Sequence, residues 1–213
     1  MDMLGQGYSG DDRYNVAPTD PVEVFRLRRD GPLEAVAMRW WLTPYWTREP
    51  TTRYSMFNAK AETLETSRAF REPFEHRRCL VPVAGFYEWA RAGGRKTPYY
   101  IRPRDDGGLL LAGIWDRWRG QEQDVLSFAI VTTTVNEKLR FVHDRQPVML
   151  SREEGRRWVT RESTGDVARS LLTNRLPCDL EALPVTDYVN STRNQGPRCA
   201  EPIGPAIVLE RAA

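Results

Sequence analysis

Glu88 stands inside an otherwise apolar stretch, where a carboxyl group could move protons. It lies between Tyr87 and Trp89 in the string GFYEW. An ionised carboxylate in apolar surroundings is costly unless it is paired, so its pKa would rise toward the range that suits a general acid or base. Strand alternation could instead point Glu88 at solvent, in which case the residue needs no role.

His143 and Asn58 are two further candidates. His143 precedes Asp144 between apolar stretches in FVHDRQPVML, and an imidazole suits proton transfer near neutral pH. Its structural alternative is a hydrogen-bonded core histidine. Asn58 in MFNAKAET could hold a reacting group through its amide, or it could cap a helix. The second histidine, His76, lies in a polar run and is predicted to be at the surface.

Basic and aromatic residues alternate in RWWLTPYW at residues 39–46, and Arg48 and Arg53 follow closely. Aromatic rings stack on bases while guanidinium groups contact phosphates, so this mixture is typical of single-stranded nucleic-acid binding. The tryptophans could equally belong to the core. The stretch is therefore a candidate binding surface with a structural alternative.

Strands are the main elements predicted to position these residues. Residues 22–27 and 33–42 flank a glycine-containing turn and predict a hairpin. Four further strands are predicted in CLVPVAGFYEW, PYYIRP, LLLAGIWDRW and LSFAIVTTT, and returning strands at residues 183–189 and 206–209. Apolar runs without alternation indicate strands that are covered on both faces.

Three helices are predicted around these strands. Residues 61–71 favour a helix that Pro73 interrupts. The string SREE from Ser151 matches a capping box and starts a helix whose Trp158 faces inward, and residues 166–172 form another. The predicted fold is α+β, with a mainly antiparallel, barrel-like mixed sheet and peripheral helices.

Length and composition narrow the class of protein. A chain of 213 residues, 40% of them apolar, can form one domain spanning residues 1–213. A net charge of +2 argues against a histone-like binder but allows a local basic groove. No apolar run reaches the roughly 18 to 20 residues of a membrane span, and the start is not signal-like. We expect a soluble, cytoplasmic, monomeric protein without contact to a membrane.

The cysteines predict neither a disulfide framework nor a zinc site. Cys79, Cys178 and Cys199 are few, irregularly spaced and without a CxxC pair, which fits a reducing compartment. Cys79 opens an apolar strand and is predicted to be buried. No metal or organic cofactor is expected, because the sequence has no ligand cluster and no phosphate-binding glycine loop.

Nine motifs in a fixed order carry a more specific signal than any single residue. They are RYNVAPT, WWLTPYW, FNAKAET, RCLVPVAGFYEW, KTPYYI, LAGIWDRW, FAIVTTTVN, VHDRQPVML and a late NQG. From about Arg13 to beyond Asn194 the chain thus resembles the SOS-response-associated peptidase family of abasic-site processing proteins. The resemblance implies a mixed α+β fold, a basic groove for single-stranded DNA containing abasic sites, and peptidase and lyase-type chemistry.

The resemblance also implies residue roles. Asn58 would orient the reacting amine and sugar, Glu88 would move protons during condensation, and His143 would assist formation and reversal of a Schiff base. The DNA-binding residues implied are Arg39, Trp40, Trp41, Lys60 and Arg145. Lys60 stands where the family usually has arginine, so it keeps the charge but lacks the bidentate fork.

The family normally opens with Met-Cys-Gly-Arg, and the resemblance implies that this cysteine, once the methionine is removed, condenses with an abasic-site aldehyde to form a thiazolidine crosslink. Here Asp2 follows Met1, and residues 1–12 are expected to be a truncated or disordered segment. Three hypotheses stay open. The true start lies upstream and the protein is an active crosslinker; or the chain binds single-stranded DNA without reacting; or it is a scaffold for a protein partner.

Overall fold

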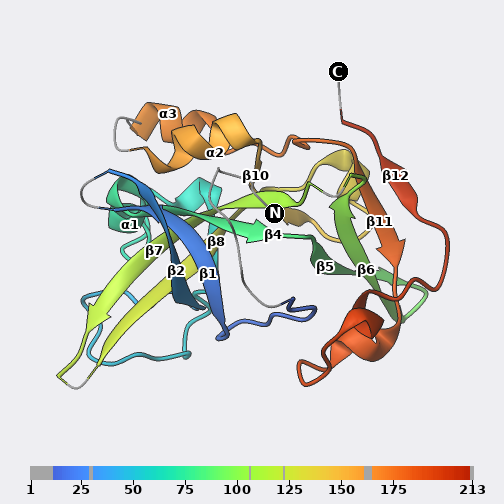
Figure 1. The fold of residues 1–213 in the computed structure, drawn as a ribbon, viewed down its shortest axis with the longest axis horizontal. Helices are drawn as coiled ribbons and strands as arrows, with labels where there is room; N and C mark the ends of the chain where they lie inside the picture. Colours follow the sequence, from blue (N-terminus) through green and yellow to red (C-terminus); the bar gives the residue numbers. More distant parts are fainter. Residues whose placement is uncertain (1–11, 29–30, 106, 122, 161–164, 212–213) are drawn as a thin grey trace.

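Five strands pair edge to edge until the sheet closes on itself as a barrel (Figure 1). The computed structural model describes residues 12–28, 31–105, 107–121, 123–160 and 165–211. In barrel order the strands are β1 (Pro21–Leu27), β2 (Leu33–Trp40), β8 (Asp124–Thr134), β7 (Leu109–Arg119) and β4 (Arg78–Val83). The β2–β8 pair is parallel and the other four pairs are antiparallel. The predicted α+β, mainly antiparallel and barrel-like fold is confirmed.

The predicted hairpin at residues 22–27 and 33–42 is β1 and β2, paired from Pro21 with Arg39 to Leu27 with Leu33. Residues 29–30 of its turn and residues 1–11 of the N-terminal segment lie outside the described residues. Three short strands extend the barrel sheet. They are β3 (Asn58–Lys60) and β9 (Arg145–Pro147), which both pair with β8, and β10 (Met149–Leu150), which pairs with β7.

A second sheet, at the right in Figure 1, is antiparallel throughout. In order it contains β12 (Ile207–Leu209), β11 (Leu180–Pro184), β6 (Arg95–Pro103) and β5 (Phe86–Ala92). The prediction of one strand through CLVPVAGFYEW is wrong, because β4 belongs to the barrel and β5 to this sheet. The chain changes sheet near Gly85, where an added Cβ would lie 2.5 Å from the carbonyl oxygen of Ile101. Only glycine allows that close approach.

Alternation along β4 divides the core. Leu80 belongs to the cluster that packs under the helices, whereas Cys79 belongs to the cluster shared with the second sheet. Helices cannot fit inside a barrel this narrow, so the Cys79 side faces the interior. The interior is tight, because a Cβ at Gly113 would lie 2.8 Å from the Cys79 sulfur. Cys79 is fully buried, as predicted, and burial raises the pKa of its thiol.

The helices only partly match the prediction. Residues 61–70 of the predicted helix at 61–71 form no α-helix, and the short 3-10 helix η1 (Ala61–Thr63) lies there instead. α1 (Arg71–His76) begins where the predicted helix was to end. Pro73 lies in its first turn, where a missing backbone N–H costs nothing, so this proline helps to start a helix and does not interrupt one. His76 is exposed, as predicted.

The capping-box prediction is confirmed in α2 (Arg152–Val159). The Ser151 hydroxyl accepts a hydrogen bond from the Glu154 N–H at 3.2 Å, and the Glu154 carboxylate accepts one from the Ser151 N–H at 2.9 Å. Trp158 is fully buried and its indole N–H donates to the Cys79 carbonyl at 3.0 Å. α2 and α3 (Gly165–Ser170) pack together beside β4 and β7 (Figure 1).

The C-terminal strands are shorter than predicted. β11 ends at Pro184, and residues predicted to continue it form the 3-10 helix η3 (Asp187–Asn190), followed by η4 (Pro197–Ala200). η2 (Glu137–Leu139) follows β8. None of the helices within the described ranges is long and apolar enough to cross a membrane.

Replacing Ser151 by alanine should lower the free energy of unfolding by about 1 kcal/mol, because the N-cap hydroxyl is lost and the Glu154 N–H is left without its acceptor. Urea unfolding followed by tryptophan fluorescence measures the change. Ser170→Ala, at the exposed end of α3, is the matched control and should change the unfolding free energy by less than about 0.5 kcal/mol. Equal effects of the two substitutions would contradict the assignment of the cap.

Candidate active site

Glu88 lies in the middle of β5, opposite Tyr99 of β6, and is partly buried. Burial raises the pKa of its carboxyl group, and the positive charge of His143 acts in the opposite direction. Glu88 is therefore not a solvent-facing carboxylate. Its environment favours a protonated carboxyl group at a higher pH than usual, which is the property expected of a general acid.

His143 lies close enough to Glu88 for its charge to act on that carboxyl group. The ring of Phe141, two residues before His143, packs edge-on against Tyr99, the strand partner of Glu88, at 5.3 Å between centroids. The His143 side chain is 47% exposed, so the core alternative is wrong. The segment that carries His143 thus packs against the sheet that carries Glu88.

The His143 ring is held at one nitrogen. Its Nδ1 accepts a hydrogen bond from the Arg145 backbone N–H at 2.9 Å. A neutral imidazole that accepts at Nδ1 carries its proton on Nε2. The Asp144 carboxylate lies 3.1 Å from the same Nδ1, so a protonated ring would have an anionic neighbour. The ring can therefore offer an N–H at Nε2 in the neutral state.

Asn58 begins β3 and is exposed, with Ile130 of β8 as its strand partner. It is not a helix cap: the cap of η1 is Lys60, which makes no side-chain capping bond. β3 pairs with the same strand, β8, that pairs with β9 just after His143. Convergence of the Asn58 amide with Glu88 and His143 stays a prediction.

Glu62 and Arg145 join β3 to the His143 turn. The Arg145 guanidinium donates to the two carboxylate oxygens of Glu62 at 3.2 and 2.9 Å, and to the hydroxyl and carbonyl oxygens of Thr132 at 3.2 and 2.8 Å. This guanidinium lowers the pKa of the Glu62 carboxyl group. Sequence reasoning missed Glu62, because no local pattern indicates a contact over 83 residues.

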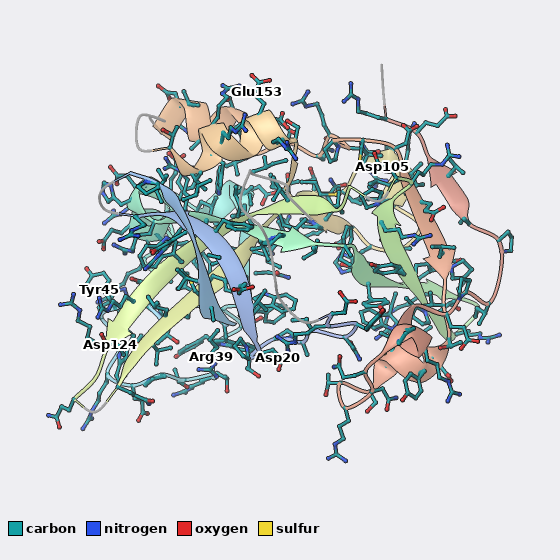
Figure 2. All side chains as sticks on the ribbon, in the orientation of Figure 1. Asp20, Arg39, Tyr45, Asp105, Asp124 and Glu153 are labelled. Atoms are coloured by element: carbon teal, nitrogen blue, oxygen red, sulfur yellow. The ribbon has the colours of Figure 1, made fainter. Side chains whose placement is uncertain are left out.

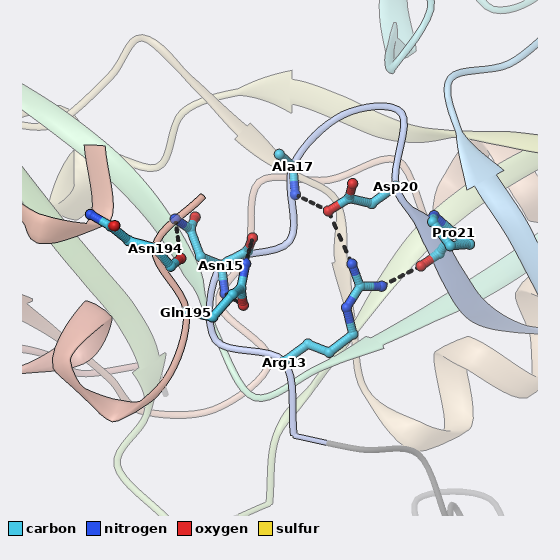
Figure 3. Close-up of polar contacts among 7 residues, drawn as sticks. All are labelled: Arg13, Asn15, Ala17, Asp20, Pro21, Asn194 and Gln195. Carbon is cyan, nitrogen blue, oxygen red and sulfur yellow. Dashed lines mark hydrogen bonds and ion pairs between the residues drawn. The ribbon is translucent and has the colours of Figure 1, made fainter. Parts of the chain in front are cut away.

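The RYN and NQG motifs hold each other, as Figure 3 shows. The buried Asn15 side-chain amide donates to the carbonyl oxygens of Val189, Ser191 and Asn194 at 3.0 to 3.2 Å. The Gln195 amide donates to the Asn15 carbonyl at 2.9 Å and accepts from the Asn15 N–H at 3.3 Å. The sequence singled out both motifs but gave no reason for their pairing.

The same segment contacts the strand of Glu88. The Tyr87 hydroxyl donates to the Tyr14 carbonyl at 2.9 Å, and Arg13 binds Asp20 at 3.0 Å and the Pro21 carbonyl. The Tyr87 bond therefore holds residues 13–15 beside β5.

The predicted DNA-binding tryptophans serve packing as well. Trp40 donates its indole N–H to the Phe57 carbonyl at 2.9 Å, and Trp41 packs on the Phe57 ring at 5.3 Å between centroids. Both are partly buried, and they hold the residue just before Asn58. Figure 2 shows Arg39 beside Asp20 on the lower edge of this view, and Lys60 is exposed on β3. Their contacts with DNA stay predictions.

Exposed aromatic rings follow these tryptophans in the loop after β2. Tyr45, Trp46 and Tyr54 are 54%, 39% and 59% exposed. Arg68 lies over the Trp46 ring at 4.1 Å, and Arg53 lies over Tyr54 at 5.7 Å. Arg53 and Tyr54 are adjacent in sequence, whereas Arg68 and Trp46 are far apart. No local sequence pattern therefore indicated the contact between Arg68 and Trp46. Tyr45 is at the left end of Figure 2, away from the second sheet.

Three hydrogen bonds from the barrel fix this loop at alternate residues. Ser127 accepts from the Thr43 N–H at 2.8 Å, Asp116 accepts from the Tyr45 N–H at 3.0 Å, and the Trp118 indole donates to the Thr47 carbonyl at 2.8 Å. These bonds hold residues 43–47 against the barrel, so the exposed rings of Tyr45 and Trp46 are presented without a large ordering cost.

In the part of the chain that the structure describes, no group of three or more His, Cys, Asp or Glu side chains could hold a metal ion. The site thus consists of a carboxyl group with a raised pKa, an exposed histidine and an anchored N-terminal segment. The fold and the site define a class of proteins in which a barrel with an appended sheet carries a partly buried carboxyl group and an exposed histidine.

The chain belongs to the SOS response associated peptidase (SRAP) family, whose model matches residues 4–192. It is 35% identical over 192 residues to the abasic site processing protein YoqW of Bacillus subtilis, covering 88% of this chain and 85% of that protein. It is 31% identical over 193 residues to the abasic site processing protein YedK of Escherichia coli, covering 90% and 85%.

Solved structures show the same fold. A crystal structure of a protein from Bacteroides thetaiotaomicron superimposes with a TM-score of 0.74 at 27% identity, covering 86% of this chain and 82% of that one. A phage-related protein from Bordetella bronchiseptica gives a TM-score of 0.72 at 30% identity, covering 91% and 92%. The family resemblance predicted from the nine motifs is confirmed.

Glu88→Gln should stabilise the protein at pH 7 relative to the original chain. A raised pKa in the folded state means that Glu88 favours folding below the pKa of the unfolded chain and loses this contribution as pH rises through the folded value. Glutamine has no charge to bury, so the gain at pH 7 is expected on the order of 1 kcal/mol and should shrink toward pH 4.

Urea unfolding at pH 4 and pH 7 measures this difference. Glu210→Gln, an exposed carboxylate just after β12, is the control and should show no such dependence on pH. A Glu88→Gln protein that is less stable than the original chain at pH 7 would contradict the buried-acid assignment.

Proposed function

We propose that this protein processes abasic sites in single-stranded DNA. The single observation that carries the proposal is that the His143 segment packs, through Phe141, on Tyr99, the strand partner of Glu88, whose carboxyl group is partly buried and has a raised pKa. The relatives named abasic site processing proteins support it. An abasic site exposes an aldehyde in its ring-opened form, and an amine with an acid nearby suffices to condense with it.

The proposed chemistry has two steps. An α-amine adds to the aldehyde to give a carbinolamine, and Glu88 in its protonated form donates a proton to the departing hydroxyl group, which leaves as water. The resulting iminium ion returns its N–H proton to the Glu88 carboxylate and becomes an imine. A thiol on the same residue then adds to the imine carbon and closes a thiazolidine, and the nitrogen takes up the thiol proton. The His143 Nε2–H would hydrogen-bond to a sugar or phosphate oxygen, and Asn58 would orient the amine.

The thiol in this proposal belongs to a cysteine with a free α-amine, as an N-terminal cysteine has. The cysteines of the present sequence suit the role poorly, because burial raises the thiol pKa of Cys79, Cys178 and Cys199. A side-chain cysteine also lacks the α-amine that the first step uses. The same proposal assigns the family's peptidase chemistry to removal of residues that precede this cysteine.

A second candidate function is binding of single-stranded DNA without reaction. The exposed loop favours it, because Trp46 and Tyr54 each carry an arginine beside the ring. Stacked bases and neutralised phosphates would need no nucleophile. On either function, the proposed DNA path includes Lys60 and the predicted residues Arg39, Trp40 and Trp41.

A denaturing gel with an abasic single-stranded oligonucleotide separates these functions. A chain that begins Met-Cys-Gly-Arg from in-frame upstream codons should give a heat-stable shifted band, and the chain that begins at Met1 should not. Undamaged oligonucleotide is the control, since it has no aldehyde. If both chains bind the oligonucleotide but neither gives a heat-stable band, the non-covalent function is supported. If neither chain binds even at low salt, both proposed functions are wrong.

Lys60→Ala should weaken binding of single-stranded DNA and reduce the slope of log K against log salt by about 0.7, the value for one phosphate contact on a single strand. Fluorescence anisotropy with a labelled oligonucleotide at several salt concentrations measures the slope. Lys138→Ala is the matched control, because Lys138 is exposed and bonds the Glu210 carbonyl. An unchanged slope for Lys60→Ala would remove this residue from the DNA path.

A further inference from the structure

We propose that Glu62 is a positioning residue for His143 and acts through Arg145, selecting the imidazole tautomer that carries its proton on Nε2. The functional importance of this inference rests on the proposed role of His143 in abasic-site processing. It is nevertheless a statement about the ring itself, and it can be measured without DNA.

Arg145 connects the two residues through opposite ends. Its backbone N–H donates to the His143 Nδ1 at 2.9 Å, while its guanidinium meets both oxygens of the Glu62 carboxylate. A two-point contact between a guanidinium and a carboxylate fixes direction as well as distance. Glu62 therefore holds the Arg145 side chain across β8 and, with it, the turn that places the backbone N–H under the imidazole.

The surroundings of Nδ1 explain why the turn must be held. The Arg145 N–H is a donor at 2.9 Å, but the Asp144 carboxylate at 3.1 Å and the Arg145 carbonyl at 3.2 Å are acceptors. The donor favours the tautomer in which Nδ1 is unprotonated, whereas the acceptors favour the tautomer that carries its proton on Nδ1. A small change of the turn would exchange one tautomer for the other, and the tether through Glu62 opposes that change.

The guanidinium of Arg145 is nearly saturated. Of its five N–H groups, four are used by Glu62 and Thr132, which leaves one on Nη1. Its side chain is only 22% exposed. An arginine with one remaining donor is suited to holding a turn and poorly suited to a two-point grip on a phosphate. This use differs from the direct DNA contact predicted for Arg145 from the sequence.

The neighbouring pair of Glu65 and Arg169 provides a matched control. Its carboxylate and guanidinium also meet at two points, at 3.2 and 2.8 Å, and both side chains are about half exposed. Arg169 lies in α3, and its contacts run to Glu65 and Asp166 instead of to the His143 turn. Glu65→Gln therefore measures the effect of losing a surface ion pair that has no link to His143, and the expected loss of stability is small.

The experiment is a nitrogen-15 NMR measurement of the two imidazoles at pH 8 in the original chain, Glu62→Gln and Glu65→Gln. The chain has only two histidines, so the exposed His76 is an internal reference. We expect His143 to be mainly the Nε2–H tautomer in the original chain and in Glu65→Gln. In Glu62→Gln its Nδ1–H population should rise at least threefold. Arg145→Lys, which keeps the charge but loses the fork, should act like Glu62→Gln.

An unchanged His143 tautomer in folded Glu62→Gln and Arg145→Lys would overturn the inference. A folded state is checked by an unaltered His76 signal and tryptophan fluorescence. If one variant does not fold, the other still decides.

Binding of an undamaged single-stranded oligonucleotide distinguishes the inference from the proposed function. Removing the Glu62 anion should leave the affinity equal or raise it about two- to threefold, because one negative charge near the DNA disappears. A purely structural role predicts weaker binding instead and would count against the inference. If the original chain binds no DNA at all, the proposed function fails, while the tautomer measurement decides the inference by itself.

Discussion

The pairing of β8 on both of its edges is the constraint on which the rest of the structure depends. β8 closes the barrel against β7 and β2, and it also binds β3, which carries Asn58, and β9, which follows His143. One strand thus fixes the register of two predicted catalytic elements. Since strand register is all or none, a slip of one residue on β8 would turn both sets of side chains to the opposite face.

Much of the barrel could be predicted from the sequence, because its strands are long apolar runs with clear turns between them. The break at Gly85 could not, since a strand through CLVPVAGFYEW obeys every local rule and only the close approach of Ile101 explains the change of sheet. Pro73 was misinterpreted for a related reason. A proline ends one helix or begins the next, and local sequence does not decide which.

The candidate site shows the same division. Glu88 and His143 were predictable because a charged or titratable residue in an apolar string is conspicuous. The long-range contacts around them were not predictable. Glu62 binds Arg145 and Asn15 binds Gln195 over sequence separations that leave no periodic pattern. Residues that react can be recognised by type, whereas residues that hold them are recognised only once the chain is folded.

The charges of the molecule bear on how a strand with an abasic site would be selected over undamaged DNA although the affinity for any strand is low. Several arginines are neutralised within the protein, including Arg145 by Glu62, Arg169 by Glu65 and Arg77 by Glu72. The net charge of the chain is also only +2, so its overall attraction for any single strand is modest. On the proposed function, undamaged DNA would dissociate readily, and only a strand with an aldehyde would be retained by a covalent bond. Discrimination would then come from the acid–base site at Glu88 and His143 and not from the strength of the binding surface.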